Sequence, residues 1–359
     1  MNNREPLRIP ASILRSYAEA VLIASGAVPE DAEIVADNLI DASLSGIDSH
    51  GISRLGIYCK RLKLGLVAHR TEVKVIRDAG IAALLSGGNG SGPVVGVRAM
   101  DLAIAKAKKF GLGIVGVRDS NHCGALAYYT SRAVTQNLIG FATTNAPSTM
   151  PPWGARVAYF GTNPLSYAIP TGDPERPIVF DIATSTVARG KIILAAKANK
   201  PIPEGWALDK DGYPTTDPKE ALEGLVLPLG GAKGSGLALL VEILSGVMTG
   251  AAVGPQIGSL YDDFQKPQGV GHFFAAMQVG LLVSERDFYC RINELSKRLV
   301  ALPPALGHEE VLLPGEPERR IKRERMDKGI PLTTEIMKEL IAVGQSCGQC
   351  QSLRSYQLT

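Results

Sequence analysis

Three side chains with complementary chemistry recur at every fourth position, beginning with His50. His50, Arg54 and Tyr58 would share one face of a helix that starts near Gly51, because residues four apart lie one above the other on a helix. A guanidinium binds a carboxylate through two parallel hydrogen bonds, and an imidazole can give a proton to a carbonyl oxygen. The group therefore suits a substrate with a carboxylate and a carbonyl. The alternative is a surface helix whose Arg and Tyr side chains pack on neighbours.

Two further histidines lie beside small residues and glycines. His122 is in the segment SNHCG, and His272 is in GVGHFF. Both contexts predict turns, on which a histidine is accessible and free to orient. A single histidine is more often structural than catalytic, so neither is assigned a role from its surroundings alone.

The stretch GLGIVG at residues 111–116 has the G-x-G-x-x-G spacing of a dinucleotide-binding loop, but we predict that it binds no phosphate. A working loop follows a strand and opens a helix, whereas here Gly111 ends a helix and the later glycines lie in an apolar strand. Two other glycine turns open helices. LGGAKGSG at 229–236 places Lys233 at a helix N-terminus, where an anion is favoured, and PGEPE at 314–318 is similar. Both could also be ordinary helix N-caps.

The elements that position these residues follow from the spacing of apolar residues, Gly and Pro. Helices are predicted on both sides of His50, at 28–47 and 52–65. The middle of the chain then alternates, which is typical of an α/β fold. The predicted elements there are a strand with a Gly-rich turn at 81–93, a helix at 94–111, a strand at 112–117, a helix at 125–137 and a strand at 138–145. Residues 199–224, rich in Pro, Gly and Asp, predict a long surface excursion, and the C-terminal third is mainly helical.

The composition argues against nucleic-acid and membrane partners. The net charge is only +3, and the basic run at 319–325 lacks interleaved aromatic residues, so it is interpreted as a solvated helix face. The longest apolar stretch, 236–248, is too short to span a bilayer and contains Glu242. No export signal is recognised in the first residues, so a cytoplasmic protein is expected.

The cysteines predict neither disulfides nor a metal site. There are five, an odd number, and they are scattered along the chain. Cys347 and Cys350 form a C-x-x-C pair, for which a redox or metal role is an alternative to a plain tail. Two ligands alone make no zinc site, so no metal is expected.

Six segments in chain order together resemble the malate/L-lactate dehydrogenase family, which also contains sulfolactate, ureidoglycolate, diketogulonate and cyclic-imine reductases. The resemblance covers roughly residues 10–345. The segments are SHGISRLGIY, SNHCGALAYY, GTNPLSYAIP, FDIATSTVARGK, LGGAKGSGLALLVEILSG and PGEPE. Two departures are Cys123, where the family commonly has an aromatic residue, and Ala232 with Ser235 around the lysine of the glycine loop. They open space near the site and leave the substrate undetermined.

The resemblance implies an α/β fold with a mixed, largely antiparallel sheet flanked by helices, rather than a Rossmann fold. Residues 1–75 and 285–359 would form a helical lobe. Residues 76–284 would form a cofactor-binding α/β core with a smaller inserted helical subdomain. Members of the family are typically homodimers with the active site near the subunit interface.

The resemblance also implies roles for individual residues. His50 would donate the proton to the substrate oxygen and Arg54 would hold the substrate carboxylate, while His122 takes the acid/base role in some members. The other residues implied to bind substrate are Ser49, Tyr58, Ser120 and His272. The residues implied to bind NAD or NADP are Val179, Phe180, Asp181, Ile182, Ala183, Thr184, Ser185, Lys233, Gly234, Pro314, Gly315 and Glu316.

The expected function is therefore hydride transfer between NAD(P) and a small 2-hydroxy acid or its 2-oxo acid. One alternative is the reduction of a cyclic imine carboxylate, in which the same histidine would protonate nitrogen. A second alternative is a non-catalytic protein that only binds a ligand, against which the intact histidine, arginine and lysine argue.

Overall fold

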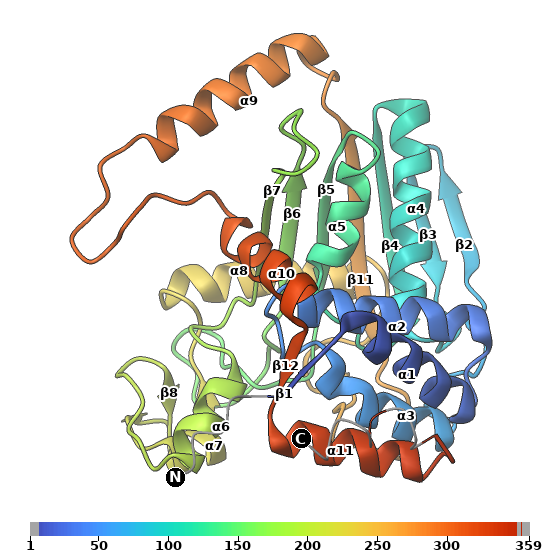
Figure 1. The fold of residues 1–359 in the computed structure, drawn as a ribbon, viewed down its shortest axis with the longest axis vertical. Coiled ribbons are helices and arrows are strands. Elements are labelled where there is room, and N and C mark those ends of the chain that lie inside the picture. Colours follow the sequence, from blue (N-terminus) through green and yellow to red (C-terminus); the bar gives the residue numbers. More distant parts are fainter. Residues whose placement is uncertain (1–6, 350–352, 354–359) are drawn as a thin grey trace.

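The computed structural model describes residues 7–349 and 353, and is built on one large mixed sheet (Figure 1). The seven strands lie in the order β2-β3-β4-β11-β5-β6-β7. Their bounds are Lys74–Ala79 for β2, Ala82–Ser86 for β3, Leu112–Ser120 for β4, Val270–Gln278 for β11, Leu138–Thr144 for β5, Leu165–Ile169 for β6 and Ile178–Ile182 for β7. Only β3 and β4 are parallel neighbours. The expected α/β fold with a largely antiparallel sheet is confirmed.

Helices α4 (Gly92–Phe110) and α5 (Ala127–Val134) pack against the sheet in front of it in Figure 1. Helix α8 (Ala232–Glu242), continued by the π-helical turn η2 (Ile243–Val247), contacts the sheet as well and lies behind it in that view. Small side chains let α4 approach β4 closely. A Cβ added to Gly113 would lie 2.0 Å from the Ala103 carbonyl oxygen. GLGIVG is thus a helix end followed by a tightly packed strand, as predicted, and opens no helix.

The N-terminal helices form a second layer below the sheet in Figure 1, with α11 packed against them. Their bounds are Ala11–Ala24 for α1, Pro29–Leu44 for α2, Ile52–Arg54 for the short helix η1, Leu55–Lys63 for α3 and Thr334–Gln345 for α11. Strand β1 (Leu7–Ile9) pairs antiparallel with β12 (Ile330–Leu332), which follows α10 (Glu316–Lys328). Segments from both ends of the chain therefore share one core.

Helix α9 (Glu285–Val300) stands apart from this lobe. It extends beyond the end of the sheet in Figure 1 and buries none of its residues. The lobe boundary at residue 285 stays a prediction, and α9 is the helix that begins there.

The segment after β7 folds as a small unit of its own. It contains α6 (Arg189–Lys197), α7 (Pro218–Glu223) and a three-stranded sheet in the order β10-β8-β9. Its strands are Ala207–Leu208, Pro214–Thr215 and Leu225–Val226 for β8, β9 and β10. Its core is Val187, Ile192, Ile202, Ala207, Ala221 and Val226. The segment predicted as a surface excursion thus packs around a small core, and this unit contains a three-stranded sheet as well as helices.

Two absences hold for the part of the chain that the structure describes. No helix there is long and apolar enough to cross a bilayer. No group of three or more His, Cys, Asp or Glu side chains there is arranged to hold a metal ion. Cys350 lies outside the described residues, so the C-x-x-C pair is seen only at Cys347.

Candidate active site

The His50 turn connects α2 to η1, and its tight approach to α2 explains the glycine that follows. The Ile52 N–H donates to Ser43 Oγ at 2.9 Å, and a Cβ on Gly51 would lie 2.1 Å from that oxygen. Arg54 ends η1 and Tyr58 lies in α3. The first helical turn, η1, is a 3-10 turn, and His50 lies before it. The α-helix in the structure therefore begins slightly later than predicted.

Tyr58 meets the second histidine at the end of β4. The Tyr58 hydroxyl is 2.7 Å from His122 Nδ1, and the Gly124 N–H donates to the same nitrogen at 3.3 Å. Since Nδ1 accepts a hydrogen bond, the neutral His122 ring carries its proton on Nε2. The rings of His50 and His122 stack, with centroids 5.4 Å apart and planes 20° from parallel. Two histidines and a phenol thus form one contiguous group.

The third histidine is buried in the central strand, and its predicted turn is wrong. The register pairs His272 in β11 with Thr144 at the end of β5. Its Nδ1 lies 2.8 Å from Thr144 Oγ1 and its Nε2 lies 2.8 Å from Ser120 Oγ. Both His272 and Ser120 have no exposed surface. Neither side chain therefore offers an accessible surface for the predicted contact with substrate. Their hydrogen bonds instead join three neighbouring strands.

Burial keeps the imidazoles neutral in the free protein. It lowers the His50 pKa to about 4, with a further contribution from the nearby Arg54 guanidinium. Burial also lowers the His122 pKa well below its usual range, and the charges of His50 and Arg54 act in the same direction. Burial raises the Tyr58 pKa. The Arg54 guanidinium is therefore the charge that the group presents at neutral pH, and an anion bound there would raise both histidine pKa values.

Arg54 is oriented by its neighbours on both sides. Its Nε donates to the Ser49 carbonyl oxygen, and its guanidinium lies 5.1 Å from the centre of the Tyr261 ring. Ser49 Oγ is 3.0 Å from His50 Nδ1, so Ser49 connects the arginine and the histidine. This arrangement can hold a carboxylate beside an imidazole.

A groove of about 750 Å³ brings together two of the three predicted cofactor segments. The predicted residues that line it are Val179, Phe180, Asp181, Ile182, Pro314 and Gly315. Gly315 precedes α10 with a φ of 90°, and a Cβ there would lie 3.0 Å from the Val179 carbonyl oxygen, so this close approach needs glycine. The first turn of α10 faces the groove together with Arg319 and Lys322. Arg319 and Lys322 are cations that fit the pyrophosphate of a dinucleotide, although each is paired with a carboxylate here, Arg319 with Glu316 and Lys322 with Asp41.

The remaining predicted cofactor residues do not line this groove. Glu316 lines a neighbouring cavity and pairs with Arg319 and Arg320. Thr184 and Ser185 are buried and donate to backbone carbonyls. Ala183 is half-buried just before them. Lys233 is exposed at the start of α8, and Gly234 is buried against the Leu229 backbone.

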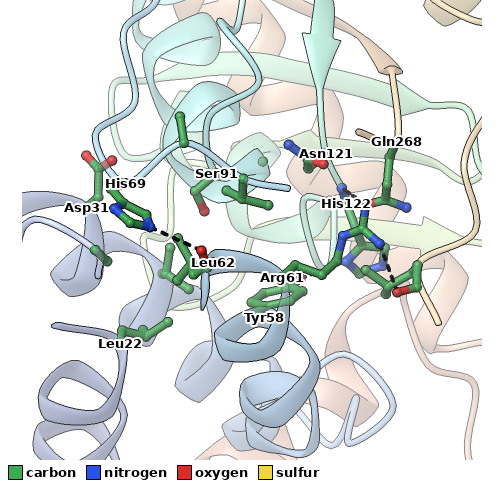
Figure 2. Close-up of a pocket in the computed structure, with 16 residues that line it drawn as sticks. Leu22, Asp31, Tyr58, Arg61, Leu62, His69, Ser91, Asn121, His122 and Gln268 are labelled. Carbon is green, nitrogen blue, oxygen red and sulfur yellow. Dashed lines mark hydrogen bonds between the residues drawn. The ribbon is translucent and has the colours of Figure 1, made fainter. Parts of the chain in front are cut away.

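Four residues near the site escaped the sequence analysis. Gln268 Oε1 accepts the His122 backbone N–H at 3.0 Å, Thr144 holds His272, and Tyr261 covers Arg54. Arg61, with 1% of its surface exposed, lines a cavity with Tyr58 and His122 (Figure 2). Only Arg61 had a usable signal, since it lies seven residues after Arg54 and so falls on the same helix face.

The chain belongs to the malate/L-lactate dehydrogenase family, whose model matches residues 9–341. Relatives include L-sulfolactate dehydrogenase from Methanocaldococcus jannaschii, which is 39% identical over 91% of this chain and 94% of its own length. An NAD(+) ureidoglycolate dehydrogenase from Escherichia coli is 33% identical, over 94% of this chain and 95% of its own. A (2R)-3-sulfolactate dehydrogenase (NADP(+)) from Chromohalobacter salexigens is 37% identical, over 92% and 96%.

Solved structures show the same fold. Sulfolactate dehydrogenase from M. jannaschii superimposes with a TM-score of 0.91 at 36% identity, covering 98% of this chain and 99% of that one. Delta1-piperideine-2-carboxylate reductase from Pseudomonas syringae superimposes with a TM-score of 0.84 at 28% identity, covering 94% and 99%. The proteins to which this chain is similar thus include, by name, enzymes of hydroxy acids and one of a cyclic imine carboxylate.

Proposed function

We propose that this protein is an NAD(P)-dependent dehydrogenase that interconverts a small malate- or lactate-like 2-hydroxy acid and its 2-oxo acid. The observation that carries the proposal is the contiguous group of His50, His122 and Tyr58 beside the guanidinium of Arg54. The family and the names of the dehydrogenases in it support the reaction class, and the named NAD(+) and NADP(+) enzymes support the cofactor.

Each side chain has a defined task in this proposal. Arg54 binds the substrate carboxylate and thereby points the adjacent carbonyl carbon toward the groove. The bound nicotinamide cofactor supplies or accepts the hydride. His50 gives its proton to the substrate oxygen during reduction and takes it back during oxidation.

His50 is the better proton donor of the two stacked rings. Its pKa lies at about 4, whereas that of His122 is lowered by its own burial and also by His50. A substrate carboxylate on Arg54 offsets the cationic charge next to His50, which is the smaller of the two causes that lower the His50 pKa, so this pKa rises when substrate binds. His122, fixed by Tyr58 and the Gly124 amide, then forms the wall against which the His50 ring is stacked.

The cofactor is proposed to lie along β7 and the start of α10. Val179–Ile182 and Pro314–Gly315 would hold it, with Arg319 and Lys322 near its phosphates. Lys233 and Gly234, at the start of α8, are also proposed to bind the cofactor, although neither lines this groove.

A homodimer is proposed as the working assembly. Several large apolar side chains of α8, of η2 with the residue after it, and of α9 are exposed. They are Leu237, Leu240, Val247, Met248, Leu295 and Leu299. Water-exposed apolar surface of this kind favours association. Sedimentation velocity that finds only a 38.0 kDa monomer would contradict the dimer.

A cytoplasmic location is proposed because four cysteines in the described residues are free thiols.

The test is a spectrophotometric screen of NADH and NADPH against a panel of 2-oxo acids, followed by two variants. His50→Ala should lower kcat by about 100-fold or more, since it removes the acid/base group. Arg54→Ala should mainly raise KM for the oxo acid, by roughly 10- to 100-fold. Near-normal turnover of His50→Ala together with an inactive His122→Ala would assign the proton to His122 instead.

The second candidate is reduction of a cyclic imine carboxylate. The superposition on a piperideine-2-carboxylate reductase favours it, because such a substrate also has a carboxylate next to the reduced carbon. His50 would then protonate nitrogen. A higher kcat/KM for a cyclic imine than for every oxo acid would select this function, and no oxidation of either reduced cofactor would indicate a protein that only binds ligands.

A further inference from the structure

A loop without regular structure covers one side of the candidate site. Its two ends are tied together, since the Gly258 N–H donates to the Gln268 carbonyl oxygen at 2.9 Å and the Gln268 amide donates to the Gly258 carbonyl oxygen at 3.2 Å. Residues 259–268 between these bonds are called the 259–268 loop. Backbone carbonyls in such a loop lack the partners that a strand or helix supplies, so they need other donors.

Arg61 of α3 supplies those donors. Its guanidinium donates to four loop carbonyls, at 3.3 Å to Ser259, 3.3 Å to Leu260, 2.8 Å to Asp263 and 3.3 Å to Lys266. Figure 2 shows Arg61 reaching from α3 toward His122 and Gln268. Three of these carbonyls lie around Nη1, whose two N–H groups they share, and the Lys266 carbonyl lies at Nη2. The planar guanidinium thus reaches acceptors from two separate nitrogens, whereas a lysine has all its donors on one nitrogen.

The loop in turn contacts the candidate site at two points. The ring of Tyr261 lies 5.1 Å from the Arg54 guanidinium, and Gln268 accepts the His122 backbone N–H. A third contact ties the loop to α3 at the surface, where the Lys60 ammonium lies 3.6 Å from the centre of the Phe264 ring. The side chains that η1 and α3 present to the loop thus include both the candidate carboxylate clamp, Arg54, and the residue that holds the loop, Arg61.

We infer that Arg61 is a positioning residue, which fixes the 259–268 loop so that Tyr261 orients Arg54 and Gln268 holds the backbone at His122. Arg54 and Arg61 are seven residues apart, or about two helical turns, so one helix face carries both. The buried Arg61 guanidinium bonds to carbonyls rather than to a carboxylate, and in the described residues its Nε has no hydrogen-bond partner. The hydrogen bonds of Arg61 therefore fix the backbone conformation of the 259–268 loop. The kinetic consequence rests on the proposed function.

The first test compares Arg61→Met with Arg61→Lys in the full-length protein. Hydrogen exchange of the loop amides should speed up at least 10-fold in Arg61→Met and by less in Arg61→Lys, while the exchange of β4 amides stays unchanged. Arg8→Met is the matched control, because Arg8 also donates to a backbone carbonyl, that of Gly329, in the ribbon of β1 and β12. Loop exchange equal to wild type in Arg61→Met would overturn the inference. If Arg61→Met does not fold, Arg61→Lys carries the same comparison.

The second test asks whether Arg61 acts through Tyr261. In Arg61→Met the KM for the 2-oxo acid should rise about 10-fold, with a smaller change in kcat and no change in the KM for the cofactor, and Arg61→Lys should recover part of the loss. Tyr261→Ala should raise the same KM. The double variant should be no worse than the more impaired single variant, since both changes break one pathway. Multiplying effects, or equal rises in both KM values, would overturn the inference.

Failure of the proposed function would be recognised separately. A wild-type protein without activity on the whole substrate panel contradicts the proposed function, whereas the exchange experiment still decides whether Arg61 holds the loop. Active protein with unchanged loop exchange and unchanged KM in both Arg61 variants contradicts the inference alone.

Discussion

The buried His272 should make the protein sensitive to acid by a calculable amount. Its pKa is lowered from 6.5 to about 3 because its ring is fully buried between Ser120 and Thr144. The unfolded chain binds a proton at this residue below about pH 6.5, whereas the folded protein does so only near pH 3. The free energy of unfolding is therefore complete above pH 6.5 and falls as the pH decreases through this window.

The size of the effect follows from the same two values. At pH 4 the pH lies about 2.5 units below the pKa of His272 in the unfolded chain, while the folded protein is still mostly unprotonated there. Each unit is worth about 1.4 kcal/mol, so protonation of His272 in the unfolded chain should lower the free energy of unfolding by about 3 kcal/mol. His272→Gln cannot take up a proton. It should cost about 1–2 kcal/mol at pH 7 through its weaker hydrogen bonds, yet lose about 3 kcal/mol less than wild type on acidification.

The assay is urea unfolding followed by circular dichroism at pH 7 and pH 4, at one protein concentration. The control is His308→Gln, which changes an exposed histidine and should lose as much stability as wild type. Equal losses in wild type and His272→Gln between the two pH values would refute the argument that burial holds this ring neutral.

Two further predictions concern the glycine-rich strand and the groove. Gly113→Ala should lower stability by about 3 kcal/mol in thermal unfolding, because the new methyl group would meet the Ala103 carbonyl oxygen, and it should leave the cofactor Kd unchanged. Weaker cofactor binding at unchanged stability would instead make GLGIVG a phosphate loop. Burial raises the Asp181 pKa from 3.8 to about 6, so the stabilisation from its raised pKa is complete below pH 3.8 and is lost as the pH rises through 6. Asp181→Asn should therefore raise Tm more at pH 8 than at pH 5, and an equal shift at both would contradict this.

Local periodicity was enough to predict the part of the site that lies on one helix. Helical spacing predicted that His50, Arg54 and Tyr58 lie together. The structure places Arg54 in η1 and Tyr58 in α3, whereas His50 lies in the turn before η1. The bond from Tyr58 to His122 depends on how α3 docks beneath the sheet. The spacing of residues 58 and 122 in the sequence does not show how α3 packs against the sheet.

The central strand shows the opposite case. GVGHFF was interpreted as a turn because glycines flank His272, whereas the segment is β11 and pairs with β4 and β5 on either side. These glycines serve close packing, since a Cβ on Gly271 would lie 1.9 Å from the Ser245 carbonyl oxygen. This contact is made with η2, which packs on β11 but lies well before it in the sequence, so an interpretation from neighbouring residues could not find it.

The positions of the predicted cofactor segments could not be derived from the sequence for a related reason. Glycine turns before helices were recognised at both 229–236 and 314–318, because N-terminal helix turns have a clear local signature. Their positions relative to β7 do not follow from that signature. The structure puts the second turn in the groove with Val179–Ile182 and leaves Lys233 out of the groove lining.

The strand order also constrains how the chain can be made. Strand β11 lies between β4 and β5, yet it is synthesised about 130 residues after β5. Until it emerges from the ribosome, β4 and β5 cannot bond to each other across its place, and each leaves an unpaired edge open to other chains. A nascent chain that stalls before residue 270 therefore exposes two aggregation-prone edges in its interior. Translation speed and chaperone access over residues 145–270 should therefore affect the yield of this protein.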